Sequence, residues 1–371
     1  MFHNYKFKNL DIKLIIAVIA LTIIGIFVIG SANESNQQKQ ILGMILGIFV
    51  MAGMALVDYD FLLHFHWLFY ATVIILLLSV LLFGYESGGA TRWIEMGLRF
   101  QPSELGKILL ILFFAWFFMM HEEDINKPKI IGLTLVLSAL PLILIEKEPD
   151  LSTTIVTMMI ICVMIFVTGI SYKLVGAVLG FSVPSIIILL LLISREGQTI
   201  LNEYQGLRIL AWLRPEDYPS SSYQQQNSIM AIGSGQLLGK GLGNEAFDSV
   251  KNGNYISEPH TDFIFAVVGE ELGFIGSVLI IALIFFITIE ILLIAKKAKD
   301  ISGKLICVGM ATLIGFQSFV NICVVTGLMP NTGLPLPFVS YGLTSLVTIY
   351  FGVGIVLNVG LQSKNNSGRL F

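Results

Sequence analysis

The sequence has few charged residues for its length. Asp, Glu, Lys and Arg make up only 13% of its 371 residues, whereas hydrophobic residues make up 55%, and the mean hydropathy is +0.83. A soluble domain cannot bury that much apolar surface in its core. The scarcity of charge therefore excludes an ordinary soluble protein, and nothing in the composition indicates a nucleic-acid partner.

Cysteine is equally scarce. Cys162, Cys307 and Cys323 are the only three in the sequence, and each lies inside an apolar run. This number and placement indicate neither a disulfide framework nor a zinc site. We expect the three thiols to be packing residues.

Long hydrophobic runs fill most of the chain. They are about 17–25 residues long, enough to cross a hydrocarbon layer of about 30 Å as a helix. We predict an all-α, polytopic membrane protein that forms one domain over residues 1–371 and has about ten transmembrane helices. The expected spans are residues 13–30, 41–57, 61–84, 102–120, 130–146, 151–169, 173–194, 263–295, 303–328 and 341–362.

Lysines separate the loops between these spans into two sets. By the positive-inside rule the lysine-rich set is cytoplasmic, which places both termini inside and requires an even number of spans. One long hydrophilic stretch, residues 195–262, then lies outside the cytoplasm between the seventh and eighth spans. Its aromatic residues, glycines and charges indicate a folded lid. The lysine-rich loops and tails carry Lys6, Lys8, Lys13, Lys127, Lys129, Lys173, Lys296, Lys297, Lys299, Lys304 and Lys364.

The first motif of the outer face contains a pair of charges inside a predicted span. Pro102 and Ser103 suit a helix start, and Glu104 and Lys107 lie three residues apart on one helix face. Charged side chains within a membrane usually line a cavity or a pathway, although a structural ion pair is the alternative. Under the topology above, four motif-bearing loops share the outer face: residues 85–107, 146–153, 233–262 and 329–342.

The second and third motifs are a charged turn and a glycine-rich segment. Residues 146–150 hold four charges, so they form either a solvated turn or a functional one, and Asp150 is placed to N-cap the sixth span. The run from Gly233 to Gly243 differs from a phosphate loop, because its glycines are mis-spaced and Gly241 stands where Ser or Thr should be. Contact between its backbone amides and an anionic headgroup stays open.

The fourth motif places Asp262 where water meets the membrane, at the head of an apolar helix. A carboxylate there suits a general base acting on a substrate whose lipid tail stays in the bilayer. The alternative is an ordinary N-cap aspartate. The run that follows, residues 263–295, would extend about 50 Å as one straight helix. Part of it must therefore protrude, tilt or re-enter.

Together these motifs closely resemble the SEDS family of shape, elongation, division and sporulation proteins. The resemblance spans nearly the whole chain, and five separated motifs in the right order make it specific. It implies a ten-helix peptidoglycan glycosyltransferase that polymerises lipid II beside a class B penicillin-binding protein. The motifs are residues 89–107, 149–151, 231–235, 260–273 and 336–342.

The resemblance also implies roles for individual residues. Asp262 corresponds to the catalytic carboxylate of the family's His-Thr-Asp-Phe motif, with Trp93, Glu104 and Lys107 near the site. A divalent cation, Mg²⁺ or Mn²⁺, is expected to assist, and the expected partners are lipid II, polyprenyl-diphosphate-linked glycan, membrane lipid and the penicillin-binding protein. Other residues expected to bind substrate or support the site are Arg92, Gln101, Ser103, Asp150, Ser234, His260, Thr261, Ser340 and Tyr341.

Within the family, the short tails and residues 333–338 look more like the RodA branch of cell elongation than the FtsW branch of division. Two positions depart from the family pattern. Residues 343–344 are Leu-Thr instead of Gly-Ser, and Lys147 and Glu148 replace an uncharged residue and Gln before Pro149. The alternatives are a lipid II flippase, with functional groups along a path through the bilayer, a scaffold that only recruits a transpeptidase, and a division or sporulation member of the family.

Overall fold

A computed structural model gives the fold. It describes residues 5–363 except residues 88–89, 96–98, 179, 181–183, 185–202, 244–248, 250–252 and 254. The long helices are α1 (Ile12–Ala32), α2 (Glu34–Leu56), α4 (His66–Phe83), α5 (Pro102–Met120), α6 (Pro128–Lys147), α7 (Leu151–Val167), α11 (Ile264–Lys297), α12 (Ile301–Val325) and α13 (Leu343–Leu361). Shorter elements are α3 (Tyr59–Leu63), α9 (Glu203–Leu213), α10 (Pro219–Ser234), the 3₁₀ turns Phe7–Asn9 and Glu122–Asp124, and the antiparallel strands β1 (Tyr85–Ser87), β2 (Ala90–Glu95) and β3 (Arg99–Phe100).

The prediction of an all-α polytopic membrane protein is confirmed. In the described part of the chain, eight helices are long and apolar enough to cross a membrane, and α7 is a shorter apolar helix. The predicted span 61–84 is divided into α3 and α4. Most of the predicted span 173–194 lies outside the described residues.

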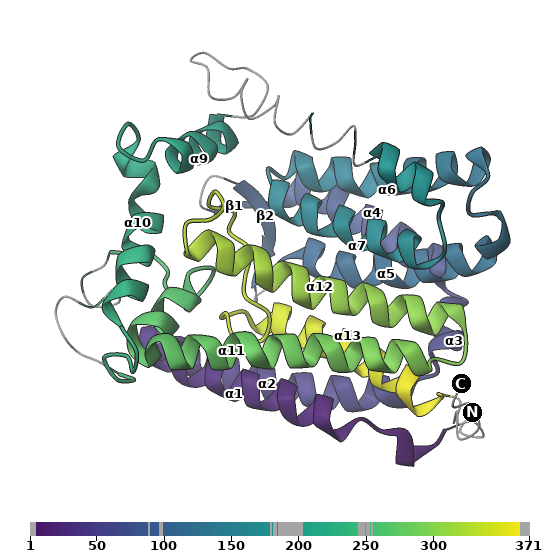
Figure 1. The fold of residues 1–371 in the computed structure, drawn as a ribbon, viewed down its shortest axis with the longest axis horizontal. Coiled ribbons are helices and arrows are strands. Elements are labelled where there is room, and N and C mark those ends of the chain that lie inside the picture. The colour runs from purple at the N-terminus through teal and green to yellow at the C-terminus, as the bar shows by residue number, and fades with distance from the viewer. Residues whose placement is uncertain are drawn as a thin grey trace.

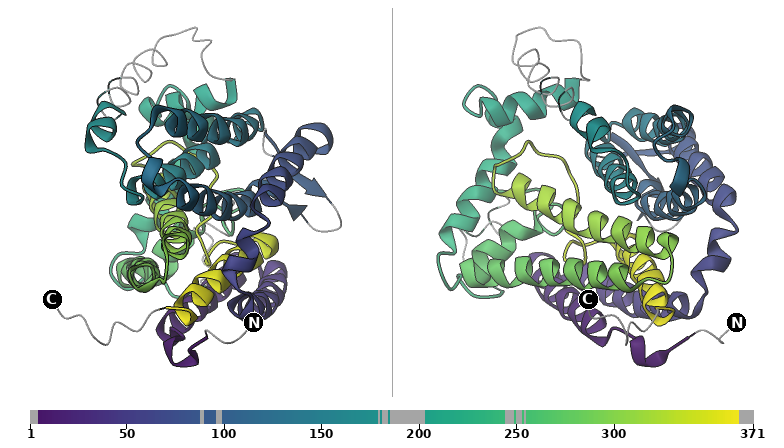
Figure 2. Two further views of the ribbon diagram at one scale, coloured as in Figure 1. Left: turned by 90° about the vertical axis from the view of Figure 1, so that its right-hand side faces the viewer. Right: turned by 45° about the vertical axis from the view of Figure 1, so that its right-hand side comes forward.

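Helices α5, α12 and α13 form the centre of the bundle. In the most apolar 18-residue stretch of these helices, 78%, 72% and 61% of the stretch is buried, against 22% in α4. Helix α12 lies between α11 on one side and α5 and α7 on the other (Figures 1 and 2), and α13 packs on α2. Polar residues on α5, α12 and α13 are therefore shielded from lipid by the outer helices.

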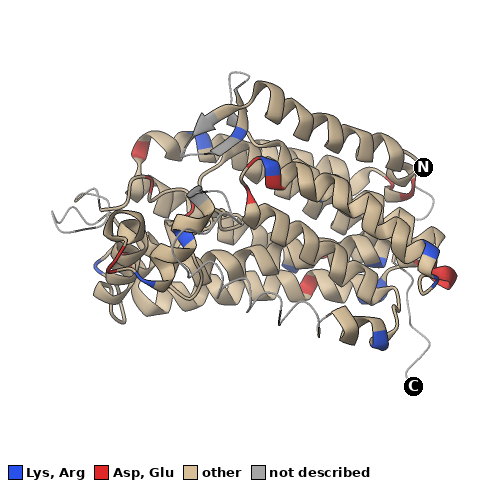
Figure 3. Ribbon diagram, turned by 90° about the horizontal axis from the view of Figure 1, so that it is seen from above, with Lys and Arg blue, Asp and Glu red and all other residues tan. Residues whose placement is uncertain are grey.

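The two ends of the bundle carry different structures. Both termini lie at one end (Figure 1), where Lys6 N donates to Leu361 O over 3.0 Å. The strands and helices α9 and α10 lie at the other end. Charged residues gather toward both ends, and the helical middle is mostly uncharged (Figure 3). The placement of both termini at one end fits an even number of spans.

Helix α11 is interrupted at Gly273, which has φ 64° and ψ −161°. Only glycine adopts this conformation without strain, and a Cβ here would collide with the backbone of Gly239 and Leu237. The preceding residues, 264–271, are buried, and this part of α11 packs on α10. The overlong predicted span is thus a short helix joined by a break at Gly273 to a membrane-crossing helix.

The glycine-rich segment after α10 packs directly against this break. Lys240 N donates to Glu270 O over 2.9 Å, and Gly241 N to Glu271 O over 3.0 Å. A Cβ at Gly235 or Gly239 would meet the backbone of residues 269–271. These glycines permit a close backbone crossing, and the amides of Lys240 and Gly241 are already occupied by protein carbonyl groups.

Candidate functional site

Asp262 lies in the loop just before α11 begins at Ile264. The N-cap of α11 is Phe263, and no side chain caps this helix, so Asp262 is not the ordinary N-cap aspartate that the sequence left open. Asp262 Oδ1 lies 2.9 Å from Thr261 Oγ1. Its carboxylate is thereby held by its own motif and not by the helix that follows.

The loop before α13 holds the Asp262 motif from the other side. Ser340 Oγ donates to Thr261 O over 2.6 Å and accepts from Leu336 N over 2.7 Å. Tyr341 N donates to His260 O over 2.9 Å. The structure thus brings together four residues from the fourth motif and the loop near its end: His260, Thr261, Ser340 and Tyr341.

Two guanidinium groups approach the Asp262 carboxylate around Gly333. A Cβ built on Gly333 would lie 3.6 Å from Arg92 Nη1, 3.8 Å from Asp262 Oδ2 and 3.9 Å from Arg208 Nη1. Gly333 has φ 74°, a conformation that favours glycine. The absence of a side chain therefore leaves a small space bordered by one carboxylate and two cations.

The surroundings of Asp262 change its acidity. Its side chain keeps partial solvent access, yet the dense packing around the carboxyl group raises its pKa through desolvation. The Thr261 hydrogen bond and the Arg208 charge act in the opposite direction. For His260, burial lowers the pKa, and the charges of Glu258 and Asp262 oppose this effect. A carboxylate whose pKa rises toward neutral pH is better suited to general-base catalysis.

Arg92 connects this space to the charged turn. Its Nε lies 3.8 Å from Asp150 Oδ2, and Gln101 Nε2 donates to the same oxygen over 3.2 Å. Asp150 Oδ1 accepts from Thr153 N over 3.1 Å, so Asp150 is the N-cap of α7, as predicted. The second motif therefore positions Arg92 beside Asp262.

Glu148 is fully buried in the same turn, and neither of its carboxylate oxygens has a hydrogen-bond partner among the described residues. Desolvation, followed by the negative charge of Asp150, raises its pKa to about 9, and Arg92 opposes the rise. The side chain is consequently a neutral acid at pH 7.

The charges of the first motif form a buried cluster in the bundle. Lys107 Nζ donates to Glu104 Oε1 over 2.7 Å and to Gln317 Oε1 over 2.6 Å. Ser345 Oγ lies 3.4 Å from Glu104 Oε2. The pair is therefore also a structural link between α5, α12 and α13, which was the alternative to a cavity lining.

Gln317 and Asn321, one turn apart on α12, continue this cluster to Asp262. Gln317 Nε2 donates to Pro335 O over 3.0 Å. Asn321 Nδ2 donates over 2.7 Å to Leu334 O and over 2.7 Å to Asp262 O. Asn321 therefore ties the loop after Gly333 to the backbone of the Asp262 motif, and Gln317 ties the same loop to Lys107.

Three predicted site residues have no such connection. Ser234 Oγ donates to Ala231 O within its own helix, over 2.7 Å. Ser103 is fully buried, and its hydroxyl has no partner among the described residues. Trp93 lies half-buried on β2, opposite Tyr85. The contacts of the described residues link none of the three to Asp262.

Sequence reasoning missed Arg208, Gln317 and Asn321. Arg208 lies on α9 inside a long loop in which no motif marked it. Gln317 and Asn321 did carry a signal, since they are polar residues spaced i, i+4 in an apolar span and so share one helix face.

These observations define the class of protein. It is a polytopic membrane protein with a carboxylate and two guanidinium groups gathered at one end of its helical bundle, opposite its termini. Comparisons with known proteins give the family.

Residues 9–365 match the family described as "Cell cycle protein", which groups FtsW, RodA and SpoVE. The chain is 33% identical to a probable peptidoglycan glycosyltransferase FtsW of Geobacter sulfurreducens over 97% of both proteins. It is also 33% identical to the peptidoglycan glycosyltransferase MrdB of Escherichia coli, covering 96% of this chain and 95% of that protein.

Solved structures agree with these relatives. A chain from a study titled "Structural coordination of polymerization and crosslinking by a peptidoglycan synthase complex" has a TM-score of 0.76 at 28% identity, covering 94% of this chain and 97% of the other. The rod shape determining protein RodA of Thermus thermophilus has a TM-score of 0.69 at 26% identity over 97% of both chains. The chain belongs to the SEDS family of FtsW, RodA and SpoVE proteins.

Proposed function

We propose that this protein is a peptidoglycan glycosyltransferase that polymerises lipid II, with Asp262 as its general base. The relatives named above as peptidoglycan glycosyltransferases support the reaction class. The observation that carries the assignment is the convergence of Asp262, Arg92 and Arg208 around Gly333. This arrangement pairs a proton acceptor with positive charge for a departing anion.

In the proposed reaction a sugar hydroxyl of incoming lipid II attacks the anomeric carbon of the growing glycan. Asp262 accepts the hydroxyl proton, the new glycosidic bond forms, and the bond to polyprenyl diphosphate breaks. A single displacement of this kind inverts the configuration at the anomeric carbon. The raised pKa of Asp262 brings its basicity closer to that of an effective base at neutral pH.

Arg92 and Arg208 are the proposed ligands of the diphosphate. Guanidinium groups bind phosphate oxygens through paired, charge-assisted hydrogen bonds. Placed beside Asp262, they stabilise the negative charge that develops on the leaving group. Lys107 is fully engaged with Glu104 and Gln317, so we assign it to support of the site and not to the diphosphate.

A divalent cation fits this site only together with substrate. Across the part of the chain that the structure describes, no three His, Cys, Asp or Glu side chains gather as metal ligands would. Mg²⁺ is commonly held by one or two carboxylates and substrate phosphates. We propose that such a cation is held by the diphosphate of the substrate, where it would supply further charge neutralisation.

We further propose an elongation role, a class B penicillin-binding protein as partner and an outer-face location for the site. Residues 333–338 favour the RodA branch. The solved chain with a TM-score of 0.76 comes from a peptidoglycan synthase complex that coordinates polymerisation and crosslinking. This likeness supports a crosslinking partner here. Lysine-rich loops at the end opposite Asp262 support cytoplasmic termini.

The function is tested by polymerisation of purified lipid II with Mg²⁺ or Mn²⁺, in the presence and absence of the partner. We expect glycan chains from the wild type and none from Asp262→Asn, with unchanged folding by thermal unfolding. Glu216→Gln is the control, since Glu216 is an exposed carboxylate between α9 and α10. Polymer from Asp262→Asn would remove the aspartate from the mechanism. Lipid II translocation in vesicles without polymer would favour a flippase.

A further inference from the structure

A cavity of about 530 Å³ lies at the end of the bundle away from Asp262. Its floor is α12, represented by Val308, and its walls are α7 and α11, represented by Phe166 and Leu292. Its volume is within the usual range of about 300–1,000 Å³ for small-molecule sites. None of its lining residues belongs to the proposed reaction site.

The mouth of this cavity is basic. Lys296 in the last turn of α11 and Lys304 in the first turn of α12 both line it, with Tyr172 beside them. Neither lysine forms an ion pair with any carboxylate that the structure describes. Asp300, between the two helices, caps α12 and accepts from the Tyr59 hydroxyl. Both oxygens of its carboxylate therefore already accept hydrogen bonds from groups other than these lysines.

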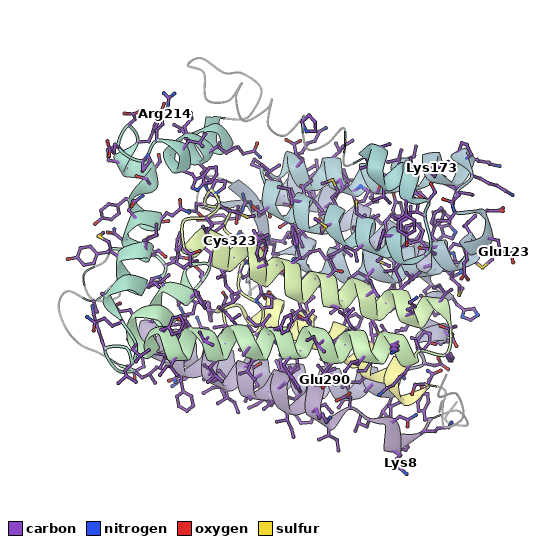
Figure 4. The ribbon with its side chains drawn as sticks, viewed as in Figure 1. Lys8, Glu123, Lys173, Arg214, Glu290 and Cys323 are labelled. Carbon is purple, nitrogen blue, oxygen red and sulfur yellow. The ribbon has the colours of Figure 1, made fainter. Side chains whose placement is uncertain are left out.

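The cavity lies among the lysine-rich loops. Figure 4 labels Lys173, which follows Tyr172, toward the end of the bundle that carries the termini, and Arg214 toward the opposite end. The positive-inside rule assigns this end to the cytoplasmic leaflet, where anionic phospholipids attract basic residues. The apolar walls suit the acyl chain of such a lipid, and the two lysines at the mouth suit its phosphate.

We propose that this cavity is a binding site for an anionic phospholipid of the inner leaflet. Its phosphate pairs with Lys296 and Lys304, and part of an acyl chain lies along Val308 between Phe166 and Leu292. The lipid would then bridge α7, α11 and α12. This site is independent of the proposed glycosyltransferase activity.

The test is native mass spectrometry of the purified full-length protein, titrated with phosphatidylglycerol or with phosphatidylcholine of the same acyl chains. We expect a preference for phosphatidylglycerol that falls about thirtyfold in the Lys296→Gln/Lys304→Gln variant. Lys297→Gln is the control for charge, because Lys297 is exposed and does not line the cavity. It should bind as the wild type does.

A second pair of variants separates the cavity from the surface around it. Leu292→Trp fills the cavity, whereas Leu293→Trp adds the same bulk outside it; the two leucines are 43% and 42% exposed. We expect only Leu292→Trp to weaken phosphatidylglycerol binding. Equal binding of the two lipids by the wild type would overturn the proposal. So would equal affinity of the double-lysine variant and Lys297→Gln, or undiminished binding by Leu292→Trp.

Discussion

Glu148 gives the protein a pH dependence of stability that can be measured. In the folded state its pKa is about 9, raised from an ordinary value of 4.5. Between these two values, the folded protein holds a proton on Glu148 that the unfolded chain releases. The stabilisation is therefore complete below pH 4.5 and is lost as the pH rises through 9. Within that window each pH unit lowers the free energy of unfolding by about 1.4 kcal/mol.

Glu148→Gln removes this linkage, because an amide of nearly the same shape does not ionise. From pH 5.5 to 7.5, deprotonation linked to Glu148 should lower the free energy of unfolding of the wild type by about 3 kcal/mol. The variant should not show this decrease. Thermal unfolding in detergent across this range should show a Tm that falls several degrees further in the wild type. Glu146→Gln, an exposed carboxylate in the same turn, should keep the wild-type slope. Identical slopes for wild type and Glu148→Gln would refute a neutral buried acid.

Three further predictions concern the reaction site, each measured as the rate of glycan formation from lipid II. Arg208→Lys keeps the charge but loses the planar guanidinium group, so kcat should fall about tenfold. Arg214→Lys, just past the end of α9, should keep the wild-type rate. Equal rates for the two variants would exclude Arg208 from binding the diphosphate. Asn321→Leu leaves the carbonyl groups of Asp262 and Leu334 without their donor, at a cost of about 1–3 kcal/mol each, and should lower kcat more than it raises KM; a change in KM alone would contradict a positioning role. Because burial raises the pKa of Asp262, the rate should fall as the pH drops through that raised value, and a flat profile down to pH 4 would exclude the aspartate as the base.

The membrane architecture could be predicted from the sequence because hydropathy dominates folding in lipid. Every backbone polar group in the bilayer must be bonded internally, so the long apolar runs within the described residues form helices near their predicted bounds. The break between α3 and α4 was missed, since no Pro or Gly marks residues 64–65. Gly273 was one glycine among several, and only its positive φ identifies it as the break.

The reaction site was predictable where it follows motifs and unpredictable where it depends on packing between distant segments. Asp262 and Asp150 lie beside recognisable helix starts, which made them candidates. Arg208 reaches the site from α9, and Asn321 reaches it from near the end of α12. A single sequence contains no information on which of its many polar residues meet across such separations. The glycine-rich segment was ambiguous for the same reason, since glycines serve equally for anion binding and for close packing.

The break at Gly273 separates Asp262 from the membrane-crossing part of α11. Asp262 precedes a helix of nine residues. The 236–241 segment is hydrogen-bonded to the backbone on both sides of the break, at Glu270 and Glu271 before it and at Phe274 and Ile275 after it. Asn321 on α12 also donates to Asp262 O, so the position of Asp262 is fixed by the glycine-rich segment and by α12 together. The angle between the two parts of α11 is therefore set by backbone packing across the break, and the position of Asp262 does not follow the direction of the membrane-crossing helix.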